Sequence, residues 1–311
     1  MVKDGTLGES GPEKRASYMI GATEVPVRGA EAALHLVATP IGNLGDITIR
    51  ALETLAGADI VACEDTRTTR ILLDRYAIRA RTVAYHEHNA AEAGPRLIAS
   101  LKEGRSVALV SDAGTPLVSD PGYRLVGEAV EAGIRVVPVP GASAVLSALT
   151  ASGLPSDTFL FAGFLPARDG QRRTRLEALR AAPATLIFYE SPRRLADSLG
   201  AMAQTLGETR QGVVARELTK TFEEFRRATL RELADHYAQA GAPKGEVVVC
   251  IAPPMEGDTP DEADIDSLLL NLARDLPAAK AAGEAAKMTG LSKQDLFNRL
   301  VALKSDGRTE G

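Results

Sequence analysis

Short apolar runs alternate with amphipathic helical stretches through the first half of the chain. Five runs have the length and the aliphatic content of buried strands, at residues 32–39, 58–64, 81–86, 106–112 and 134–140. Helical stretches follow them in turn, at residues 48–55, 68–76, 90–103, 123–132 and 143–151. Neighbouring parallel strands need a long crossover connection, which is usually a helix. The alternation therefore predicts an α/β domain built on a mostly parallel sheet.

The pattern restarts after Pro155. Four further apolar runs are separated by helical segments, at residues 158–164, 184–191, 212–219 and 246–253, and they predict a second α/β domain. Three short helical patterns follow at residues 265–274, 278–288 and 293–303, and the last two have helix-turn-helix character. We therefore expect a disordered leader at 1–31, α/β domains at 32–155 and 156–254, an acidic linker at 255–264 and a helical domain at 265–305.

The charge of the chain is unevenly distributed. Its formal net charge is −5, but six acids and no base lie between residues 256 and 266, and without these six acids the chain sums to +1. Seven arginines lie between residues 164 and 194, at positions 168, 172, 173, 175, 180, 193 and 194. Such a cluster suits a surface that faces phosphates, with a solvated helix face as the alternative. The negative net charge therefore does not exclude a nucleic-acid partner.

The sequence predicts neither a membrane span nor a metal site. Its longest uncharged run, residues 136–156, contains three prolines, which break a spanning helix. The first thirty residues lack an apolar stretch of signal-peptide length. Cys63 and Cys250 lie in apolar runs and are too few for a zinc site or a disulfide framework. We expect a soluble, cytoplasmic protein without a bound metal.

Three loops after predicted strands are candidate ligand-binding segments, because ligands of open α/β sheets collect at the carboxyl ends of the strands. Their sequences are TPIGN at 39–43, SDAGTP at 111–116 and PGAS at 140–143. None is a G-x-G-x-x-G or P-loop motif, which disfavours dinucleotide and triphosphate ligands. Small residues with the Asp112 carboxylate, and no lysine, suit a neutral or cationic ligand such as S-adenosylmethionine. Three routine turns between strand and helix are the alternative.

Nine motifs in order carry a resemblance to a known family: VATPIGNLGDIT, ACEDTR, HEHN, SDAGTPLVSDPG, VPGASA, FLFAGFLP, IFYESPRR, ARELTKTFEE and KGEVVVCIA. Together they resemble the tetrapyrrole methylase superfamily and, within it, the ribosomal RNA small subunit methyltransferase I family. The resemblance covers about residues 34–253 and is weaker in the C-terminal helices. It implies two α/β domains with S-adenosylmethionine in the cleft between them and a homodimer. It also implies 2′-O-methylation of a cytidine ribose in 16S rRNA, on free RNA or in the 30S particle.

The resemblance also implies which residues would contact the cofactor. Eight come from the three loops of the first domain and three from the second domain: Pro40, Ile41, Asp112, Gly114, Thr115, Pro116, Ser143, Ala144, Tyr189, Glu190 and Leu218. Tetrapyrrole-modifying relatives carry a G-x-G-P-G type first loop and a Gly-Asp-Pro second loop. This chain has ATPIG and SDAGTP at those places. These differences favour an RNA substrate over a corrin or porphyrin.

Methylation of a ribose hydroxyl needs either a base that removes its proton or a cation that stabilises the developing alkoxide. Candidates lie in three motifs: Glu64 and Asp65 in ACEDTR, His88 in HEHN, and Glu217, Lys220 and Glu223 in RELTKTFEE. We expect Lys220 with Glu217, and Glu64 with Asp65, to frame the acceptor. A structural ion pair or helix cap is the alternative for each pair.

We expect RNA phosphates near a set of basic residues: Arg67, His88, Arg172, Arg173, Arg193 and Arg216. The C-terminal helices are a further candidate RNA contact. Two other functions stay open, a non-catalytic RNA-binding protein of ribosome assembly and a tetrapyrrole methyltransferase. The intact SDAGTP and PGAS loops disfavour the first of these. The arginine-rich stretch, the RELTKTFEE segment and the C-terminal helices disfavour the second.

Overall fold

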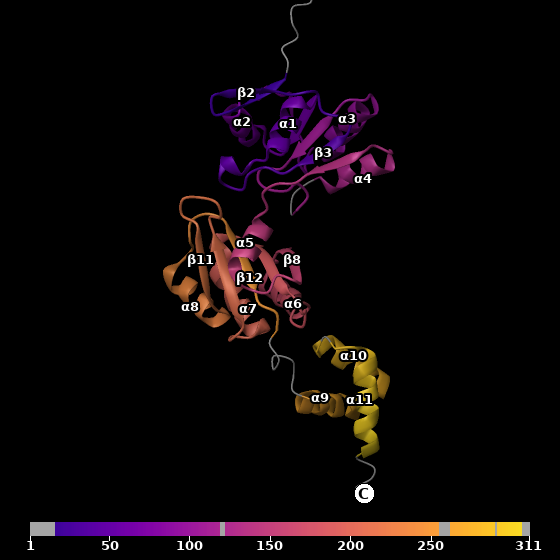
Figure 1. The fold of residues 1–311 in the computed structure, drawn as a ribbon. Helices are drawn as coiled ribbons and strands as arrows, with labels where there is room; N and C mark the ends of the chain where they lie inside the picture. Colours follow the sequence, from indigo (N-terminus) through magenta and orange to yellow (C-terminus); the bar gives the residue numbers. More distant parts are fainter. Residues whose placement is uncertain (1–15, 119–121, 255–261, 290, 307–311) are drawn as a thin grey trace, which may run out of the picture. The chain divides into compact units, whose positions relative to one another are not determined.

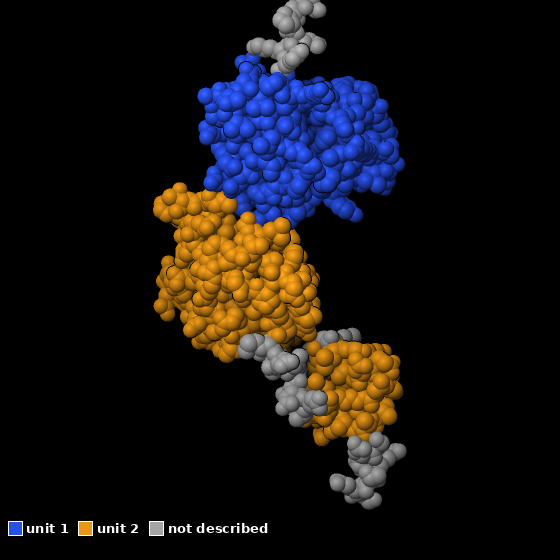
Figure 2. All heavy atoms as spheres, in the orientation of Figure 1, with its two compact units in different colours: residues 1–144 blue, residues 145–311 orange. Residues whose placement is uncertain are grey.

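The computed structural model describes residues 16–118, 122–254, 262–289 and 291–306. The chain divides into two compact units, Met1–Ala144 and Val145–Gly311 (Figure 2). The division falls after the first residue of the helix at 144–152, which the sequence-based boundary after residue 155 assigns to the first domain. Among the described residues, none of the helices has both the length and the apolar character needed to span a bilayer.

The first unit is built on a five-stranded sheet whose strands are all parallel (Figure 1). The spatial order is β5-β4-β6-β3-β7. In chain order these strands are β3 (Leu34–Val37), β4 (Ile60–Cys63), β5 (Thr82–Ala84), β6 (Val107–Val110) and β7 (Val136–Val139). Each lies inside one of the five predicted apolar runs, so the predicted parallel sheet is confirmed.

Helices cover both faces of this sheet. α1 (Ile49–Gly57) and α2 (Thr66–Arg75) share a hydrophobic core with one set of strand side chains, whereas α3 (Ala90–Lys102) and α4 (Tyr123–Glu131) share another core with the alternate set. In β4, for example, Val61 belongs to the first core and Ala62 to the second. Successive side chains of a strand point to opposite faces, so a strand covered on both sides is a continuous apolar run.

The predicted disordered leader is wrong for residues 17–26. There β1 (Ser17–Ile20) and β2 (Thr23–Pro26) form an antiparallel hairpin, turned at Gly21 with a φ of +60°. Tyr18 is only 2% exposed and belongs to the same hydrophobic core as α1. The backbone N–H of Met19 donates to the Tyr76 carbonyl at 2.8 Å. Burial of the Tyr18 side chain therefore holds residues 17–26 on the first unit. The scattered charges of this segment had suggested that it is disordered. Residues 1–15 lie outside the described residues.

The second unit contains a mixed five-stranded sheet with the order β11-β10-β12-β9-β8. Its strands are β8 (Phe159–Phe164), β9 (Thr185–Glu190), β10 (Gln211–Arg216), β11 (Glu224–Thr229) and β12 (Val247–Ile251). Only β8 and β9 pair in parallel; the other neighbours are antiparallel. The sequence analysis did not predict β11, whose EFRRAT sequence is charged because it lies at an edge of the sheet.

Three helices cover one face of the second sheet. α6 (Asp169–Glu177), α7 (Leu195–Leu206) and α8 (Leu230–Ala240) share a core with side chains of β9, β10 and β12. On β11, Arg227 donates to the carbonyls of Ala151 and Ser152, the last two residues of α5 (Ala144–Ser152). A cation at a helix C-terminus satisfies carbonyls that have no partner inside the helix. Arg227 therefore anchors α5 to the sheet.

The C-terminal helices form a separate cluster. α9 (Glu262–Asp275), α10 (Ala278–Thr289) and α11 (Lys293–Asp306) bury an aliphatic core of their own. Arg299 of α11 pairs with Asp266 of α9 at 2.5 Å. The predicted C-terminal helical domain is confirmed. Residues 255–261 of the predicted acidic linker lie outside the described residues.

Candidate active site

Neighbouring strands β3 and β6 lead to helices on opposite faces of the first sheet. The chain passes from β3 to α1 on one face and from β6 to α4 on the other. Ligands of open α/β sheets usually bind at the carboxyl ends of two such strands. The loops after these two strands are the predicted TPIGN and SDAGTP segments. The topology therefore points to the edge that the sequence analysis selected.

Hydrogen bonds join the three predicted loops to one another. Thr39 and Gly114 form an antiparallel bridge, with N···O distances of 2.9 and 3.0 Å. The Thr39 hydroxyl donates to the Ser111 carbonyl at 3.3 Å, and Thr39 is 4% exposed. The Thr115 hydroxyl donates to the Ala142 carbonyl at 3.3 Å, which ties in the PGAS loop. The structure therefore brings the three loops together within one unit.

Glycines allow the loops to approach one another this closely. Gly114 has a φ of +80°, and a Cβ added there would lie 3.2 Å from Cγ2 of Ile41. A Cβ on Gly141 would lie 3.0 Å from Cβ of Ala38. L-residues rarely adopt a positive φ, and both contacts are tighter than ordinary van der Waals distance. The cradle is therefore built for small residues, as the loop sequences predict.

Asp112 links this cradle to the ACEDTR segment. It is exposed, and its Oδ1 accepts a hydrogen bond from the backbone N–H of Asp65 at 3.0 Å. Asp65 is the N-cap of α2, because its Oδ1 accepts from the backbone N–H of Arg67 at 2.8 Å. The Arg67 guanidinium also pairs with Asp65, at 2.7 Å. The carboxyl ends of β3, β4, β6 and β7 thus contribute to one connected set of loops.

The contacts of Asp65 are those of a helix cap and an ion pair. Side-chain and backbone hydrogen bonds from Arg67 lower the pKa of Asp65 to about 2. A carboxylate with so low a pKa is a weak base at neutral pH. The half-buried Glu64, its neighbour, stays the candidate base of this pair. Arg67 itself keeps 90% of its side chain exposed, so it can still face a phosphate.

In the second unit, Lys220 lies between two carboxylates. Its Nζ donates to Oε1 of Glu217 at 2.7 Å and to Oε2 of Glu246 at 2.9 Å. Burial alone lowers the pKa of Lys220, but hydrogen bonds to Glu217 and Glu246 outweigh it and leave the pKa above its usual value. The hydrogen bond from Lys220 lowers the pKa of Glu217. The pair is therefore an ammonium and a carboxylate at neutral pH, and the ammonium can stabilise negative charge but is no base.

The backbone around this pair is unusual. Glu217 and Thr219 have φ values of +52° and +65°, and Gly245 has a φ of +92°. A Cβ on Gly245 would lie only 2.2 Å from Cδ of Glu217, so Gly245 leaves the space that the Glu217 carboxylate fills. Positive φ at residues other than glycine costs free energy and gathers at functional sites. Gly245 and Glu246 were not among the predicted site residues, although they lie in the KGE triplet that opens the last motif.

Neighbours of Lys220 among the predicted residues have structural partners. Arg216 pairs with Glu224 at 3.0 Å and donates to the Lys244 carbonyl at 3.2 Å. Leu218 is 7% exposed. Arg216 therefore holds the β10–β11 hairpin to the turn before β12. Its predicted phosphate contact would compete with the ion pair.

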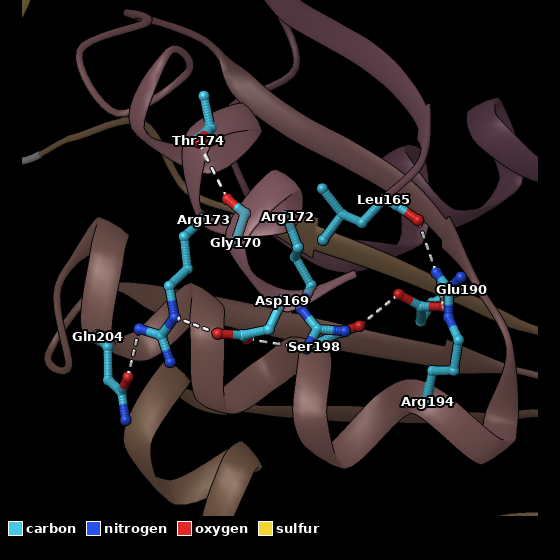
Figure 3. A network of polar contacts seen from close by, with 10 residues as sticks. All are labelled: Leu165, Asp169, Gly170, Arg172, Arg173, Thr174, Glu190, Arg194, Ser198 and Gln204. Atoms are coloured by element: carbon cyan, nitrogen blue, oxygen red, sulfur yellow. Dashed lines mark hydrogen bonds and ion pairs between the residues drawn. The ribbon is translucent and has the colours of Figure 1, made fainter. Parts of the chain in front are cut away.

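Glu190 lies inside a buried polar network, drawn in Figure 3. Its Oε1 accepts from the Ser191 N–H at 2.7 Å and from Nε of Arg194 at 2.9 Å, and its Oε2 accepts from the Ser198 hydroxyl at 2.5 Å. These contacts fix β9 to α7. They give the buried Glu190 carboxylate a structural role that requires no bound cofactor. Tyr189 faces the opposite side of the sheet, so the two predicted cofactor contacts do not share a surface.

The predicted RNA-binding residues differ in exposure. Arg172 pairs with Asp169 at 3.0 Å, and only 7% of its side chain is exposed, which argues against its predicted phosphate contact. Arg173 is exposed and pairs with Asp169 and Gln204 (Figure 3). Arg193 is exposed. His88 is exposed too, with its ring 6.1 Å from that of His86.

Within the ranges that the structure describes, no group of three or more His, Cys, Asp or Glu side chains could hold a metal ion. Cys63 and Cys250 are buried, as the core-packing interpretation predicts. Burial raises the pKa of the Cys63 thiol, and it raises the pKa of the Cys250 thiol to about 12. Neither thiol is therefore a nucleophile at neutral pH.

Comparisons with known proteins identify the family. A model of the tetrapyrrole (corrin/porphyrin) methylases matches residues 33–234, and a model of the RsmI C-terminal HTH domain matches residues 259–304. A Mesorhizobium japonicum protein named ribosomal RNA small subunit methyltransferase I is 70% identical, covering 94% of this chain and 100% of that protein. An Escherichia coli O157:H7 protein of the same name is 48% identical, covering 89% and 97%.

Solved structures agree on the fold. Uroporphyrin-III C-methyltransferase from Thermus thermophilus, complexed with S-adenosyl homocysteine, matches 71% of this chain and 97% of its own with a TM-score of 0.51 and 19% identity. At that identity the likeness concerns the fold alone. The matched models and the identity over nearly the whole chain carry the assignment. The chain belongs to the tetrapyrrole methylase family and, within it, to the family of ribosomal RNA small subunit methyltransferase I.

Proposed function

We propose that this chain transfers the methyl group of S-adenosylmethionine to the 2′-hydroxyl of a cytidine ribose in small-subunit ribosomal RNA. The observation that carries the proposal is 70% identity over 94% of the chain to a protein named ribosomal RNA small subunit methyltransferase I. The substrate is 16S rRNA, free or in the 30S particle. We also propose that the protein acts as a cytoplasmic homodimer.

The loops of the first unit suit this donor. S-adenosylmethionine is a cationic sulfonium that supplies an activated methyl group, and its hydrogen-bond donors are ribose hydroxyls, the adenine amino group and an α-ammonium. The exposed Asp112 carboxylate offers an acceptor beside the small-residue cradle of Gly114 and Thr115. The main-chain groups of Pro40, Ile41, Ser143 and Ala144 complete the proposed donor contacts in this unit. The same loops lack a lysine, in agreement with a cationic ligand.

The Lys220 ammonium is the proposed stabiliser of the acceptor oxygen. Methyl transfer requires the hydroxyl oxygen in line behind the methyl group, and negative charge develops on that oxygen as its proton leaves. Glu217 and Glu246 hold the ammonium on two sides. We propose Tyr189 and Leu218 as donor contacts from this unit and Glu64 as the acceptor-side base.

Incubation with labelled S-adenosylmethionine and small subunits that lack the modification tests the function. Label in the rRNA, located to a 2′-O-methylcytidine by nuclease digestion, is the expected result. Label that appears only in a tetrapyrrole would instead support a tetrapyrrole methyltransferase. RNA binding without any transfer of label would support a non-catalytic role in ribosome assembly.

Replacing Asp112 with alanine is expected to weaken donor binding about 10- to 100-fold, because hydrogen bonds to a charged group contribute about 1.5–3 kcal/mol. Titration calorimetry with S-adenosylmethionine measures the change. Asp74→Ala is the matched control, since Asp74 is another exposed aspartate of the same unit and its ion pair, with Arg70, lies within α2. Normal donor affinity of Asp112→Ala would contradict the proposed donor site.

The pH dependence of methyl transfer follows from the Lys220–Glu217 pair. The pKa of Lys220 is raised above 10.5 and that of Glu217 is lowered below 4.5. Both charges, and the stability that they contribute, are therefore fully present between these two values. The contribution of Lys220 is lost as pH rises through its raised pKa, and that of Glu217 as pH falls through its lowered pKa.

We therefore expect the initial rate to show no ionisation from this pair between pH 4.5 and pH 10.5. Lys220→Ala should lower the whole pH–rate profile without moving its inflections. A neutral-pH inflection that disappears in Lys220→Ala would make Lys220 a general base and would contradict the proposed role.

A further inference from the structure

A β-bulge in β8 redirects Phe164. Along β9 the pairing advances by two residues, from Ile187 to Tyr189, whereas along β8 it advances by three, from Phe161 to Phe164. The extra residue is accommodated at Gly163, whose φ is +68°. Bulges of this kind re-aim a side chain at the end of a strand. The strand belongs to the FLFAGFLP motif, to which the proposed reaction assigns no role.

The bulge gathers three aromatic rings at the carboxyl end of β8 and β9. The Tyr189 ring lies 4.8 Å from the ring of Phe161 and 5.6 Å from that of Phe164, edge to face in both pairs. Phe161 is half-buried, but Phe164 remains 57% exposed. An ordinary core phenylalanine would be covered. Packing against Tyr189 therefore holds an exposed ring in a fixed orientation.

Two exposed arginines lie on the segments next to the end of β8. Nη2 of Arg194 donates to the Leu165 carbonyl at 2.7 Å, which joins the turn after β9 to the loop after β8 (Figure 3). Arg193 precedes Arg194 on that turn, and Arg168 follows Phe164 by four residues in that loop. Within the described part of the chain, exposed Arg193 and Arg168 form no ion pair, whereas Arg194 pairs with Glu190. The segments that adjoin Phe164 thus carry two cations that no carboxylate neutralises there.

We propose that Phe164, Arg168 and Arg193 form a binding site for single-stranded RNA. An unpaired base stacks on Phe164, and the arginines contact the phosphates that flank that base. Single-stranded RNA is recognised by aromatic stacking together with cationic contacts, whereas a purely apolar partner would gain nothing from unpaired arginines. The inference rests on the proposed function and adds a position where the protein holds RNA outside the reacting ribose.

A fluorescence experiment tests the stacking directly. The chain has no tryptophan, so Phe164→Trp introduces a single reporter. We expect a short single-stranded RNA of mixed sequence to quench this reporter, and the same RNA in a duplex to quench it far less. Phe159→Trp is the matched control, because Phe159 is 42% exposed at the other end of the same strand. An equal response of Phe164→Trp and Phe159→Trp to the single-stranded RNA would overturn the proposal, and so would quenching of Phe164→Trp by raising the protein concentration without RNA.

Affinity measurements test the same site without a reporter. We expect Phe164→Ala to weaken binding of the single-stranded RNA about tenfold, and Phe164→Tyr to restore it. Arg193→Ala should weaken binding and reduce the slope of log affinity against log salt by about 0.7. Phe159→Ala and Arg175→Ala, an exposed arginine of α6, should match the wild type. Equal affinity of Phe164→Ala and Phe159→Ala would overturn the proposal.

Methylation of small subunits by the same variants separates the two proposals. If the wild type methylates the rRNA but Phe164→Ala and Arg193→Ala behave like their controls in both assays, the RNA site fails and the proposed function stands. If the wild type transfers no methyl group to the rRNA while Phe164→Trp is quenched by single-stranded RNA, the proposed function fails and the binding site stands.

Discussion

Replacing Lys220 with alanine is expected to lower the rate of methyl transfer about 100- to 1,000-fold, the loss typical of removing one preorganised group that stabilises developing negative charge. The physical reason is the placement of the ammonium, 2.7 Å from Glu217 and 2.9 Å from Glu246. Two carboxylates keep Lys220 charged and fixed before the acceptor arrives. Single-turnover rates on unmodified small subunits measure the effect.

Donor binding and thermal unfolding of the same variant separate chemistry from folding. Lys220→Ala should bind S-adenosylmethionine with nearly wild-type affinity. Lys220→Arg keeps the charge and is expected to recover part of the rate. Lys244→Ala is the matched control, because Lys244 is an exposed lysine of the same unit. Its contact with Arg216 is made by its backbone carbonyl, which the substitution keeps. Wild-type rates in Lys220→Ala would remove Lys220 from the reaction.

Sequence reasoning predicted Lys220 and Glu217 but not the partners that fix them. The two residues lie in one motif, three positions apart, so their pairing is a local event. Glu246 lies 26 positions after Lys220 in the chain. The antiparallel pairing of β10 with β12 brings Glu246 beside Glu217. Gly245 becomes necessary only when that pairing exists. Long-range partners of this kind leave no periodic signal in a single sequence.

The strands of the first unit were predictable because burial on both faces makes each a continuous apolar run. The elements that the sequence analysis missed are those with one solvent-facing side. β11 has three charged side chains in six residues, Glu224, Arg226 and Arg227, so it contains no apolar run, and the hairpin of β1 and β2 depends on a single buried residue, Tyr18. Their stability comes from tertiary contacts that short-range pattern does not encode.

The meeting of the three loops that we propose as the donor site was predictable for a topological reason. Parallel strands end at one edge, so the loops after β3, β6 and β7 had to meet once the sheet was parallel. The candidate RNA-binding residues were less predictable, because charge alone does not distinguish an exposed arginine from a buried, paired one. Arg172 and Arg193 belong to the same arginine-rich stretch, yet Arg172 is buried against Asp169 and Arg193 is exposed.

Replacing Glu190 with alanine is expected to lower the free energy of unfolding by about 1–3 kcal/mol, because it leaves a buried hydroxyl donor without its acceptor. Glu190 is 3% exposed and accepts hydrogen bonds from Ser191, Arg194 and Ser198. The substitution leaves the fully buried Ser198 hydroxyl without its acceptor and the Arg194 guanidinium without its counter-charge. Urea unfolding followed by circular dichroism measures the loss.

Comparison with an exposed ion pair tests whether burial is the cause of this loss. Glu177→Ala, which removes a partner of Arg180 at 3.7 Å on the surface of α6, is expected to cost less than about 1 kcal/mol. The same Glu190→Ala protein decides between the structural and the cofactor-binding interpretation of Glu190. The Glu190 carboxylate faces α7, whereas Tyr189 faces the other side of the sheet. We therefore expect Glu190→Ala to bind S-adenosylmethionine with wild-type affinity under all conditions in which this variant is folded. A variant of wild-type stability that no longer binds S-adenosylmethionine would show instead that Glu190 contacts the donor.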